Sequence, residues 1–362
     1  MADQSKGRIR GTGARRKPPT ARRKAASLAA WTAAGLVLIG GSGLGYVYIK
    51  LNGNIQGVDI NNQLGTDRPD DVDNGSMDIL VLGSDSRAGA NGKYGTDEGG
   101  ARSDTAMIVH VYEGHKKAAV VSVPRDTLID RPRCADSEGG TVPAESRAMF
   151  NTAYEVGGPA CAVKTVEKIS GIRMDHYMEV DFTGFKKLID ELGGVDITTS
   201  EAISDSKSHL DLKPGKHTLT GEQALGLVRT RKSVGNGSDL GRIQLQQAFI
   251  KAFIQQVKDV GVFTNPTKLY DLADTATKAI TPDSELDSVK ELVDFATGLK
   301  GLGAEDVQMI TMPVDYDKRD PNRVAPLKKQ GQQVWTALKN DLPIPASATK
   351  GTADGQAKGI VK

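Results

Sequence analysis

Three apolar runs follow one another in this 362-residue chain: DILVLG at Asp78–Gly83, TAMIVHVY at Thr105–Tyr112 and KAAVVSV at Lys117–Val123. The first and third show no clean alternation of apolar and polar residues, which indicates interior strands covered on both faces. Helical patterns come between and after the strands, among them an amphipathic stretch from Asp239 to about Val260. Strands that alternate with helices predict an α/β fold, which we expect as a three-layer α-β-α domain with a central mixed sheet.

The N-terminal part differs from the rest in charge and hydropathy. Residues 1–24 contain nine Lys and Arg side chains against one Asp, whereas the whole chain carries a net charge of only +2. Leu28–Ile49 is an uncharged run of 22 residues, and a helix needs roughly 20 to cross a bilayer. The run lacks the small-residue cleavage site of a signal peptide, so we expect an uncleaved transmembrane signal anchor. Because basic flanks stay in the cytoplasm, we predict a single-pass protein of the cell membrane with its N-terminus inside and its folded domain extracytoplasmic.

The basic segment has a second interpretation, as an arm that binds nucleic acid. Such an arm would lie beside a membrane without aromatic residues or a motif to support it. The adjacent anchor already accounts for the charge, so we predict no nucleic-acid partner.

Composition divides the chain into six expected parts. These are a basic cytoplasmic tail at 1–27, the anchor at 28–49, an extracytoplasmic linker at 50–76, a core at 77–258, a C-terminal helical and strand part of the same domain at 259–342, and a disordered tail at 343–362. The linker is inferred from Gly, Asn and Asp without an apolar period. The tail is inferred from its Ala, Gly, Lys and Pro content.

Two cysteines, Cys134 and Cys161, lie in the part that we place outside the membrane. In an oxidising compartment an even number of cysteines favours a disulfide, whereas two cysteines without nearby histidines make a poor zinc site. We therefore expect a Cys134–Cys161 disulfide that pins a loop and takes no part in catalysis.

Carboxylates and arginines stand at the ends of the predicted strands. Asp85 follows the first strand, Arg102-Ser103-Asp104 leads into the second, and Arg125-Asp126 follows the third. Strand ends are where open α/β sheets present ligand-binding loops. Mg²⁺ takes one or two protein carboxylates and completes its shell with water and substrate phosphates. Asp85 and Asp104 are therefore a sufficient pair for Mg²⁺, with Mn²⁺ as the alternative ion.

Further cationic residues follow near the amphipathic helix. Arg229 and Arg231 are two residues apart, so on an extended segment both side chains point to the same face. Asp239 is a natural N-cap, and Arg242 and Gln246 lie at i and i+4 on one face of the helix. Guanidinium forks match phosphate edges bidentately, and a helix N-terminus favours anions. A lone Arg–Asp pair is usually a surface ion pair. Here, however, arginines and carboxylates recur at successive strand ends and at a helix start, and this recurrence indicates phosphoryl-group chemistry.

Together these motifs resemble the LytR-CpsA-Psr family over residues 77–258. The matching blocks, in order, are Asp78–Arg87 (DILVLGSDSR), Arg102–Thr105 (RSDT), Ser122–Thr127 (SVPRDT), Asn151–Tyr154 (NTAY) with Gly157-Gly158, Asp175–Tyr177 (DHY) with Val180–Phe182 (VDF), Arg229–Arg231 (RTR), and Asp239–Arg242 (DLGR) with Gln246-Gln247. The topology expected for the anchor is also the one that this family uses.

The resemblance implies a phosphotransferase that moves an anionic or other cell-wall glycopolymer from a polyprenyl-pyrophosphate carrier to peptidoglycan and forms a phosphodiester link. It implies that Asp85 and Asp104 bind magnesium. Residues that it assigns to the pyrophosphate are Arg102, Arg229, Arg231, Arg242 and Gln246. It makes Arg125 and Asp126 catalytic: Arg125 would orient or activate the attacking hydroxyl, and Asp126 would act as the base or fix Arg125.

The family's lipid tail runs in a hydrophobic tunnel between the sheet and its flanking helices. The candidates for its lining in this chain are Phe150, Phe182, Phe185, Leu188, Phe249 and Phe253, each of which also fits plain core packing.

Two other functions use the same motifs. One is a polyprenyl-pyrophosphate hydrolase, in which water is the nucleophile. The other is a non-enzymatic, lipid-binding regulatory membrane protein, although no DNA-binding motif supports it. A phosphodiester adduct between donor and glycan would identify the transferase, and free phosphorylated polymer would identify the hydrolase.

Overall fold

The computed structural model describes residues 45–84, 103–136, 140–261, 265–353 and 355–362. The chain separates into two units, Met1–Lys50 and Leu51–Lys362. Of the run expected to be the anchor, 28–49, only residues 45–49 are described, and they are helical. Within the described ranges, no helix has both the length and the apolar character needed to cross a membrane.

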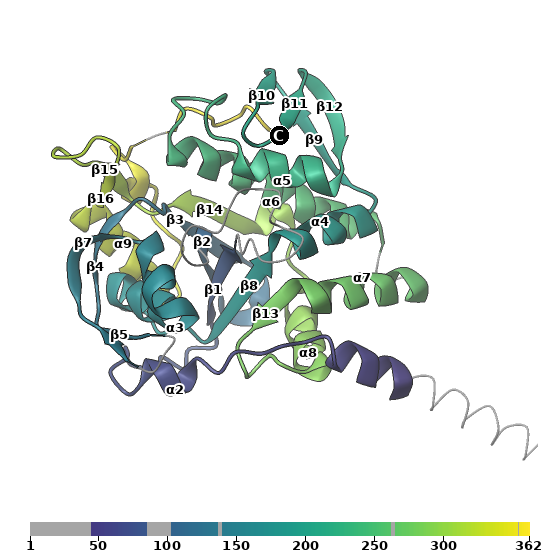
Figure 1. Ribbon diagram of the computed structural model, residues 1–362, viewed down its shortest axis with the longest axis horizontal. Coiled ribbons are helices and arrows are strands. Elements are labelled where there is room, and N and C mark those ends of the chain that lie inside the picture. The colour runs from purple at the N-terminus through teal and green to yellow at the C-terminus, as the bar shows by residue number, and fades with distance from the viewer. Residues whose placement is uncertain (1–44, 85–102, 137–139, 262–264, 354) are drawn as a thin grey trace, which may run out of the picture. The chain divides into compact units, whose positions relative to one another are not determined.

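A six-stranded mixed sheet forms the centre of the second unit (Figure 1). In spatial order its strands are β13 (Ile280–Pro282), β8 (His176–Asp181), β1 (Met77–Ser84), β2 (Ser103–Val111), β3 (Ala118–Val123) and β14 (Val307–Thr311). β1 pairs antiparallel with β2 and parallel with β8, and β3 pairs antiparallel with β2 and parallel with β14. The expected α/β fold with a central mixed sheet is confirmed.

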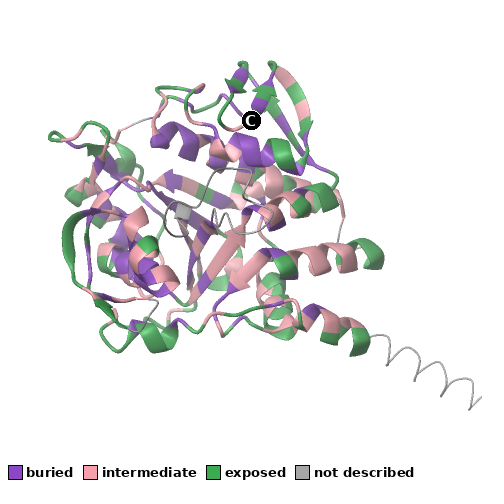
Figure 2. Ribbon diagram, in the orientation of Figure 1, coloured by how far each residue is buried: buried purple, intermediate pink, exposed green. Residues whose placement is uncertain are grey.

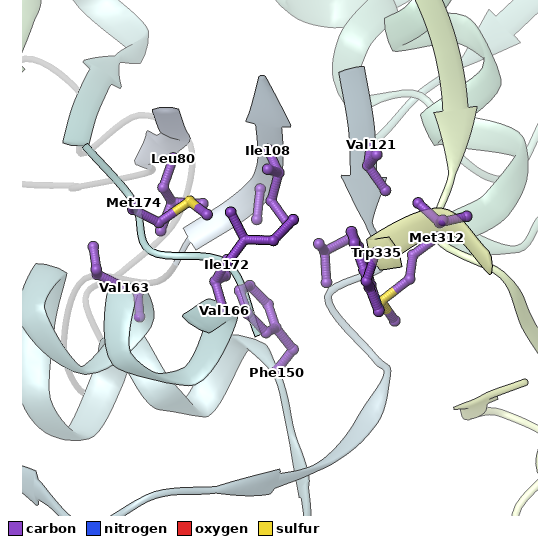
Figure 3. Packing of buried hydrophobic residues seen from close by; sticks show 14 of the residues in the cluster. Leu80, Ile108, Val121, Phe150, Val163, Val166, Ile172, Met174, Met312 and Trp335 are labelled. Carbon is purple, nitrogen blue, oxygen red and sulfur yellow. The ribbon is translucent and has the colours of Figure 1, made fainter. Parts of the chain in front are cut away.

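Helices cover both faces of this sheet. Ile108 of β2 packs in a core with α3 (Asn151–Ser170) and α9 (Lys328–Lys339), as Figure 3 shows. The next residue, Val109, points to the opposite face and packs against the same small apolar cluster as Ile254 of α6 (Asp239–Asp259). All six residues of β3 are buried, and the buried residues gather in the centre of the sheet (Figure 2). The apolar run at 117–123 is therefore an interior strand covered on both faces.

A second core lies on the α6 side. It joins α4 (Phe182–Glu191), α5 (Gly221–Arg229) and α6 to the hairpin-like pairs β9 (Val195–Thr199) with β12 (Gly215–Leu219) and β10 (Ile203–Asp205) with β11 (Leu210–Leu212). Other helices and strands of this unit are α2 (Asn61–Leu64), β4 (Leu128–Arg131), β5 (Cys134–Ala135), β7 (Glu145–Met149), α7 (Pro266–Ala279), α8 (Val289–Leu299) and β16 (Val324–Pro326).

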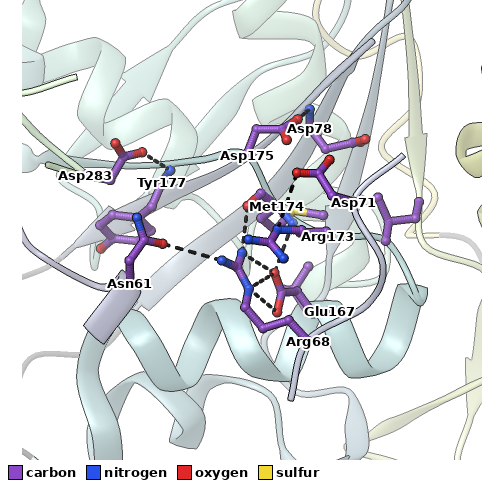
Figure 4. Close-up of polar contacts among 12 residues, drawn as sticks. Asn61, Arg68, Asp71, Asp78, Glu167, Arg173, Met174, Asp175, Tyr177 and Asp283 are labelled. Carbon is purple, nitrogen blue, oxygen red and sulfur yellow. Dashed lines mark hydrogen bonds and ion pairs between the residues drawn. The ribbon is translucent and has the colours of Figure 1, made fainter. Parts of the chain in front are cut away.

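The segment 50–76, which we expected to be a linker, packs against the domain from Leu51 onward. Four apolar residues along it are buried: Leu51, Ile55, Ile60 and Leu64. Arg68 then forms a buried ion pair with Glu167 of α3, with 2.6 Å between Nη2 and Oε1, and donates a second bond to the Met174 carbonyl (Figure 4). The linker interpretation was wrong because these apolar residues are too widely spaced to form a recognisable period.

Residues 343–362, which we expected to be a disordered tail, are also packed in their described part. Ile360 and Val361 are buried in the second core. Lys362 exchanges backbone hydrogen bonds with Thr198 of β9, at N–O distances of 2.7 and 2.9 Å. The composition is polar on average, but Ile344, Ile360 and Val361 reach core positions, and this ordered packing corrects the expectation.

The expected disulfide is present between Cys134 and Cys161, whose Cα atoms are 5.4 Å apart. It joins β5 to α3 just after the helix kinks at Gly157-Gly158. A Cβ at Gly157 would lie 2.7 Å from the Cβ of Cys161. The absence of a side chain at Gly157 is what allows the two elements to approach closely enough for the bond.

We predict that Ile360→Ala lowers the free energy of unfolding by about 2–4 kcal/mol, because a buried side chain leaves a cavity in the second core. Lys358→Ala, at an exposed position two residues away, should change it by less than about 0.5 kcal/mol. Urea unfolding followed by circular dichroism measures both. Equal stability of the two variants would show that the C-terminal segment does not pack.

One buried and one half-buried histidine, His110 and His176, tie the stability of the domain to pH. His110 lies between carboxylates, with Nδ1 2.9 Å from Asp78 Oδ1 and Nε2 3.1 Å from Asp341 Oδ1. Burial alone would lower the pKa of His110, but the two carboxylates raise it above its ordinary value of 6.5. The Asp283 carboxylate likewise outweighs burial at His176 and raises that pKa.

We expect the unfolding free energy to fall as pH rises above 6.5. Both histidines bind their proton more tightly in the folded state, so their contribution is complete below pH 6.5 and is lost through the folded-state pKa values. Urea midpoints measured from about pH 6 to pH 9 should show this loss, and His110→Gln should make the slope shallower. An unchanged slope in that variant would contradict the assignment.

Candidate functional site

Four guanidinium groups meet two carboxylates where β3 ends. We call this set the arginine cluster; its members are Arg125, Arg231, Arg242, Arg323, Asp126 and Asp239. The turn after β3 supplies Arg125 and Asp126, and the start of α6 supplies Asp239 and Arg242. Five of the six are residues that the sequence motifs singled out, so the fold brings distant motifs to one place.

Asp239 is the buried centre of the arginine cluster. Its Oδ1 lies 2.6 Å from Arg242 Nη2, 3.7 Å from Arg231 Nη2 and 3.9 Å from Arg125 Nε. Its Oδ2 accepts a bond from the Arg125 backbone N–H at 3.2 Å. We expected Asp239 to be the N-cap of α6, but Ser238 occupies that position and Asp239 is the first helical residue. The Asp239 carboxylate therefore binds arginines rather than capping the helix.

Asp126 bridges three guanidiniums at the more open side of the cluster. Its carboxylate oxygens lie 3.4 Å from Arg231 Nη2, 3.6 Å from Arg323 Nη1 and 3.7 Å from Arg125 Nε. The turn that presents it is closed by Thr127, whose N–H and Oγ1 both donate to the Pro124 carbonyl.

Arg323 is a site residue that the sequence motifs did not indicate. It stands just before β16, whose first residue, Val324, bridges to Thr127 beside the β3 turn. It belongs to no block of the family resemblance and lies outside the span 77–258. Only the pairing of two segments almost two hundred residues apart brings it beside Asp126.

The arginine cluster carries more positive than negative charge. Burial lowers the pKa of Arg231, and the nearby guanidiniums of Arg125 and Arg242 lower it further, while Asp239 and Asp126 act in the opposite direction. A cavity of about 550 Å³ opens beside Arg125, Arg231 and Arg323. Guanidinium groups that face a cavity are suited to binding an anion with several oxygen atoms.

Arg229 and Gln246 lie outside the cluster. The guanidinium carbon of Arg229 stands 5.1 Å from the ring centroid of Phe182. The Gln246 amide donates to Thr105 Oγ1 at 3.0 Å and to the Val228 carbonyl at 2.9 Å. The same-face geometry expected of two residues on an extended segment does not apply to Arg229 and Arg231, because Arg229 is the last residue of helix α5 and Thr230 is extended.

An apolar cavity of about 330 Å³ lies between the sheet and helices α4, α5 and α6. Five of the six expected tunnel residues line it: Phe182, Phe185, Leu188, Phe249 and Phe253. Phe150 does not, because it is buried in the core on the α3 side of the sheet. A pattern of aromatic residues could not tell the two faces of the sheet apart, which is why Phe150 was wrongly included.

Of the two expected metal ligands, only the backbone of Asp104 lies within the described part of the chain. Asp85 and Arg102 lie outside the described residues. The backbone of Asp104 is in β2, where Gly83 pairs with Thr105 and Ser84 with Ser103, so Asp104 is the extra residue of a bulge beside the end of β1. Among the described residues no group of three His, Cys, Asp or Glu side chains is placed to hold a metal ion.

Fold and site together define an α/β protein that pairs an anion-binding arginine cluster with an apolar cavity. The LytR_cpsA_psr family model matches residues 47–340. The chain therefore belongs to the LytR-CpsA-Psr family.

Two curated relatives show how far the similarity extends. The chain is 33% identical over 305 residues to the cell wall biosynthesis protein LcpA of Corynebacterium glutamicum, which covers 75% of this chain and 57% of the relative. It is 30% identical over 341 residues to the polyisoprenyl-teichoic acid–peptidoglycan teichoic acid transferase TagT of Bacillus subtilis, which covers 91% of this chain and 98% of the relative. The chain thus spans little more than half of LcpA and almost all of TagT.

Solved structures share the fold. TagT bound to LI-WTA superposes with a TM-score of 0.56 at 26% identity, over 76% of this chain and 97% of that chain. The LytR-Csp2A-Psr enzyme from Actinomyces oris has a TM-score of 0.58 at 21% identity, over 79% of this chain and 96% of that chain. The second likeness concerns the fold alone.

We predict that Asp239→Ala destabilises the domain by about 3–5 kcal/mol, because it leaves the buried Arg242 without its closest carboxylate. Asp126→Ala should cost no more than about 1 kcal/mol, since the guanidiniums around Asp126 are partly exposed to solvent. Chemical unfolding of both variants in parallel tests the difference. Equal losses would mean that Asp239 does not hold the cluster together.

Proposed function

We propose that this chain is a phosphotransferase that moves a cell-wall glycopolymer from a polyprenyl-pyrophosphate carrier to peptidoglycan. The product is a phosphodiester link between the two polymers. Family membership and the similarity to the teichoic acid transferase TagT support this class of reaction.

Two segments of the chain contribute residues to both the arginine cluster and the apolar cavity, and this shared position is the main support for the proposal. On α6, Arg242 belongs to the cluster, and Gln246, one helical turn later, lines the apolar cavity. After α5, Arg231 belongs to the cluster, while Arg229 stands over Phe182 of the cavity lining. A polyprenyl pyrophosphate has an anionic head and an apolar tail, which match a cationic cluster that adjoins an apolar cavity.

The described residues have separable roles in this reaction. Arg231 and Arg242, with Arg323, neutralise the pyrophosphate, which is the main requirement of phosphoryl transfer. Arg125 lines the cavity beside the arginine cluster. We assign it the role of orienting or activating the attacking hydroxyl. Because Asp126 contacts three guanidiniums, we assign it to orienting Arg125 and Arg231.

We further propose that Asp85 and Asp104 hold Mg²⁺. Their carboxylates are the hard oxygen donors that this ion prefers, and the bulge keeps the backbone of Asp104 beside Ser84, the residue before Asp85. The bound ion would neutralise charge on the phosphates. Arg102, which leads into Asp104, would contribute to the same anion site.

Membrane attachment completes the proposal. The uncharged run 28–49 would anchor the chain beside its lipid-linked donor, with the folded domain extracytoplasmic. The Cys134–Cys161 disulfide supports this placement, because disulfides persist in oxidising compartments.

We expect Arg125→Ala to lower turnover of a lipid-pyrophosphate-linked donor by about 10²–10³-fold, the usual effect of removing one group that stabilises developing charge. Asp104→Ala should in addition lose the response to added Mg²⁺. Arg173→Ala removes a guanidinium whose ion pair with Asp71 is long and largely exposed, and it should keep full activity.

The products of this assay separate the transferase from the hydrolase. A phosphodiester adduct on the glycan acceptor, detected by mass spectrometry, is the expected result. Release of free phosphorylated polymer alone would favour the hydrolase, and full activity of both site variants would refute the site assignment.

A further inference from the structure

A second large cavity lies on the other side of the sheet from the apolar cavity. We call it the α3–α9 groove; it has a volume of about 930 Å³, and its lining includes Leu128, Arg147, Lys168, Lys328, Trp335 and Lys339. Trp335 belongs to the core shared by α3 and α9, whereas the apolar cavity faces α4, α5 and α6. Nothing in the donor-binding role assigned above uses this groove.

The groove continues from the arginine cluster along two neighbouring segments. Asp126 lies in the cluster and Leu128, two residues later, lines the groove. On the facing segment Arg323 lies in the cluster and Ala325 lines the groove. The bridge between Thr127 and Val324 joins the two segments between these points. On both segments the lining of the groove therefore begins two residues from the cluster.

A strained arginine connects the groove to the cluster. Arg147 has a φ of 58°, which is uncommon outside glycine. Its Nη2 lies 3.1 Å from Asp317 Oδ1, which also accepts bonds from the backbone N–H groups of Arg319 and Asp320. Asp317 in turn donates its backbone N–H to the Arg323 carbonyl at 2.9 Å. Such strain persists where surrounding contacts hold it and is frequent at functional sites.

The lining of the groove is suited to an acidic carbohydrate. Lys168, Lys328 and Lys339 are exposed, and none of them has an ion-pair partner in the described part of the chain. Trp335 exposes 9% of its surface and lines the groove, and an indole N–H is a hydrogen-bond donor. Cations with an available N–H donor match a chain of sugars that carries carboxylates.

The direction of attack favours the acceptor as the occupant. In phosphoryl transfer the attacking and leaving oxygens lie roughly in line on opposite sides of the phosphorus. The apolar cavity would place the leaving lipid phosphate on the α6 side, so the nucleophile must approach from another side. The α3–α9 groove leads to the arginine cluster from the opposite face of the sheet.

We propose that the α3–α9 groove binds the glycan strand of peptidoglycan that accepts the polymer, with the carboxylates of its stem peptides near Lys168 and Lys328. This inference rests on the proposed function, because it takes the transfer acceptor to be a glycan. It adds a binding site and names the residues that recognise the acceptor.

Tryptophan fluorescence gives a direct test of binding. The chain contains two tryptophans, Trp31 and Trp335, so full-length protein carrying Trp31→Phe reports on the groove alone. Soluble, uncrosslinked peptidoglycan strands with stem peptides should shift its emission saturably. Lys168→Glu combined with Lys328→Glu should raise the half-saturating strand concentration by about tenfold, since two cations are replaced by two anions.

A matched control makes the same change of charge elsewhere. Lys207→Glu with Lys216→Glu alters two exposed lysines beside β10 and in β12, and it should bind strands as the parent protein does. No emission shift, or equal weakening by the two double variants, would overturn the groove assignment.

The transfer assay keeps this inference separate from the proposed function. In the same proteins, Lys168→Glu combined with Lys328→Glu should raise the KM for the strands and leave the KM for the lipid-linked donor unchanged. Strand binding that depends on Lys168 and Lys328 but yields no adduct would refute transfer and retain the groove. Adduct formation with an unchanged KM for the strands would retain transfer and refute the groove.

Discussion

The buried carboxylate of Asp239 is the interaction on which the site depends. It joins the start of α6 to the turn after β3 through the Arg125 backbone N–H, and it lies within 3.9 Å of guanidinium nitrogens from Arg125, Arg231 and Arg242. Three arginines could not be held so close together without an anion among them, because like charges repel strongly where solvent is largely excluded. One carboxylate therefore sets the position of three arginines of the cluster.

The central sheet separates two kinds of surface. Successive residues of a strand point to opposite faces, so β2 and β3 contribute to the apolar cavity on the α6 side and to the α3–α9 core on the other. The arginine cluster lies where these two sides meet, at the end of β3. In the reaction that we propose, this arrangement would let a lipid tail and an acceptor polymer approach the same phosphates from different faces of the sheet.

The C-terminal segment, residues 343–362, packs against the start of α6 and the loop before it, which carry part of the arginine cluster. Gly355 lies so close to Gly241 that any side chain there would collide with the backbone of α6. The Gly355 carbonyl also accepts a bond from the Asn236 N–H in the loop before the helix, and the Ala357 N–H donates to Gln244. The loop 232–238 and the start of α6 are thus held by residues that composition alone suggested were disordered.

The local sequence indicated the central strands β1, β2 and β3, the disulfide and five of the six members of the arginine cluster, because each depends on signals within a few residues. Continuous apolar runs marked β1 and β3, and the blocks around Arg125, Arg231 and Arg242 carried their charges in recognisable motifs. Long-range packing decided the rest. Arg323 reaches Asp126 only through the bridge of Val324 to Thr127, and Phe150 lies on the other face of the sheet from the cavity that its residue type suggested. Sequence shows which side chains are charged or apolar, but only the pairing of distant segments decides which of them share a surface.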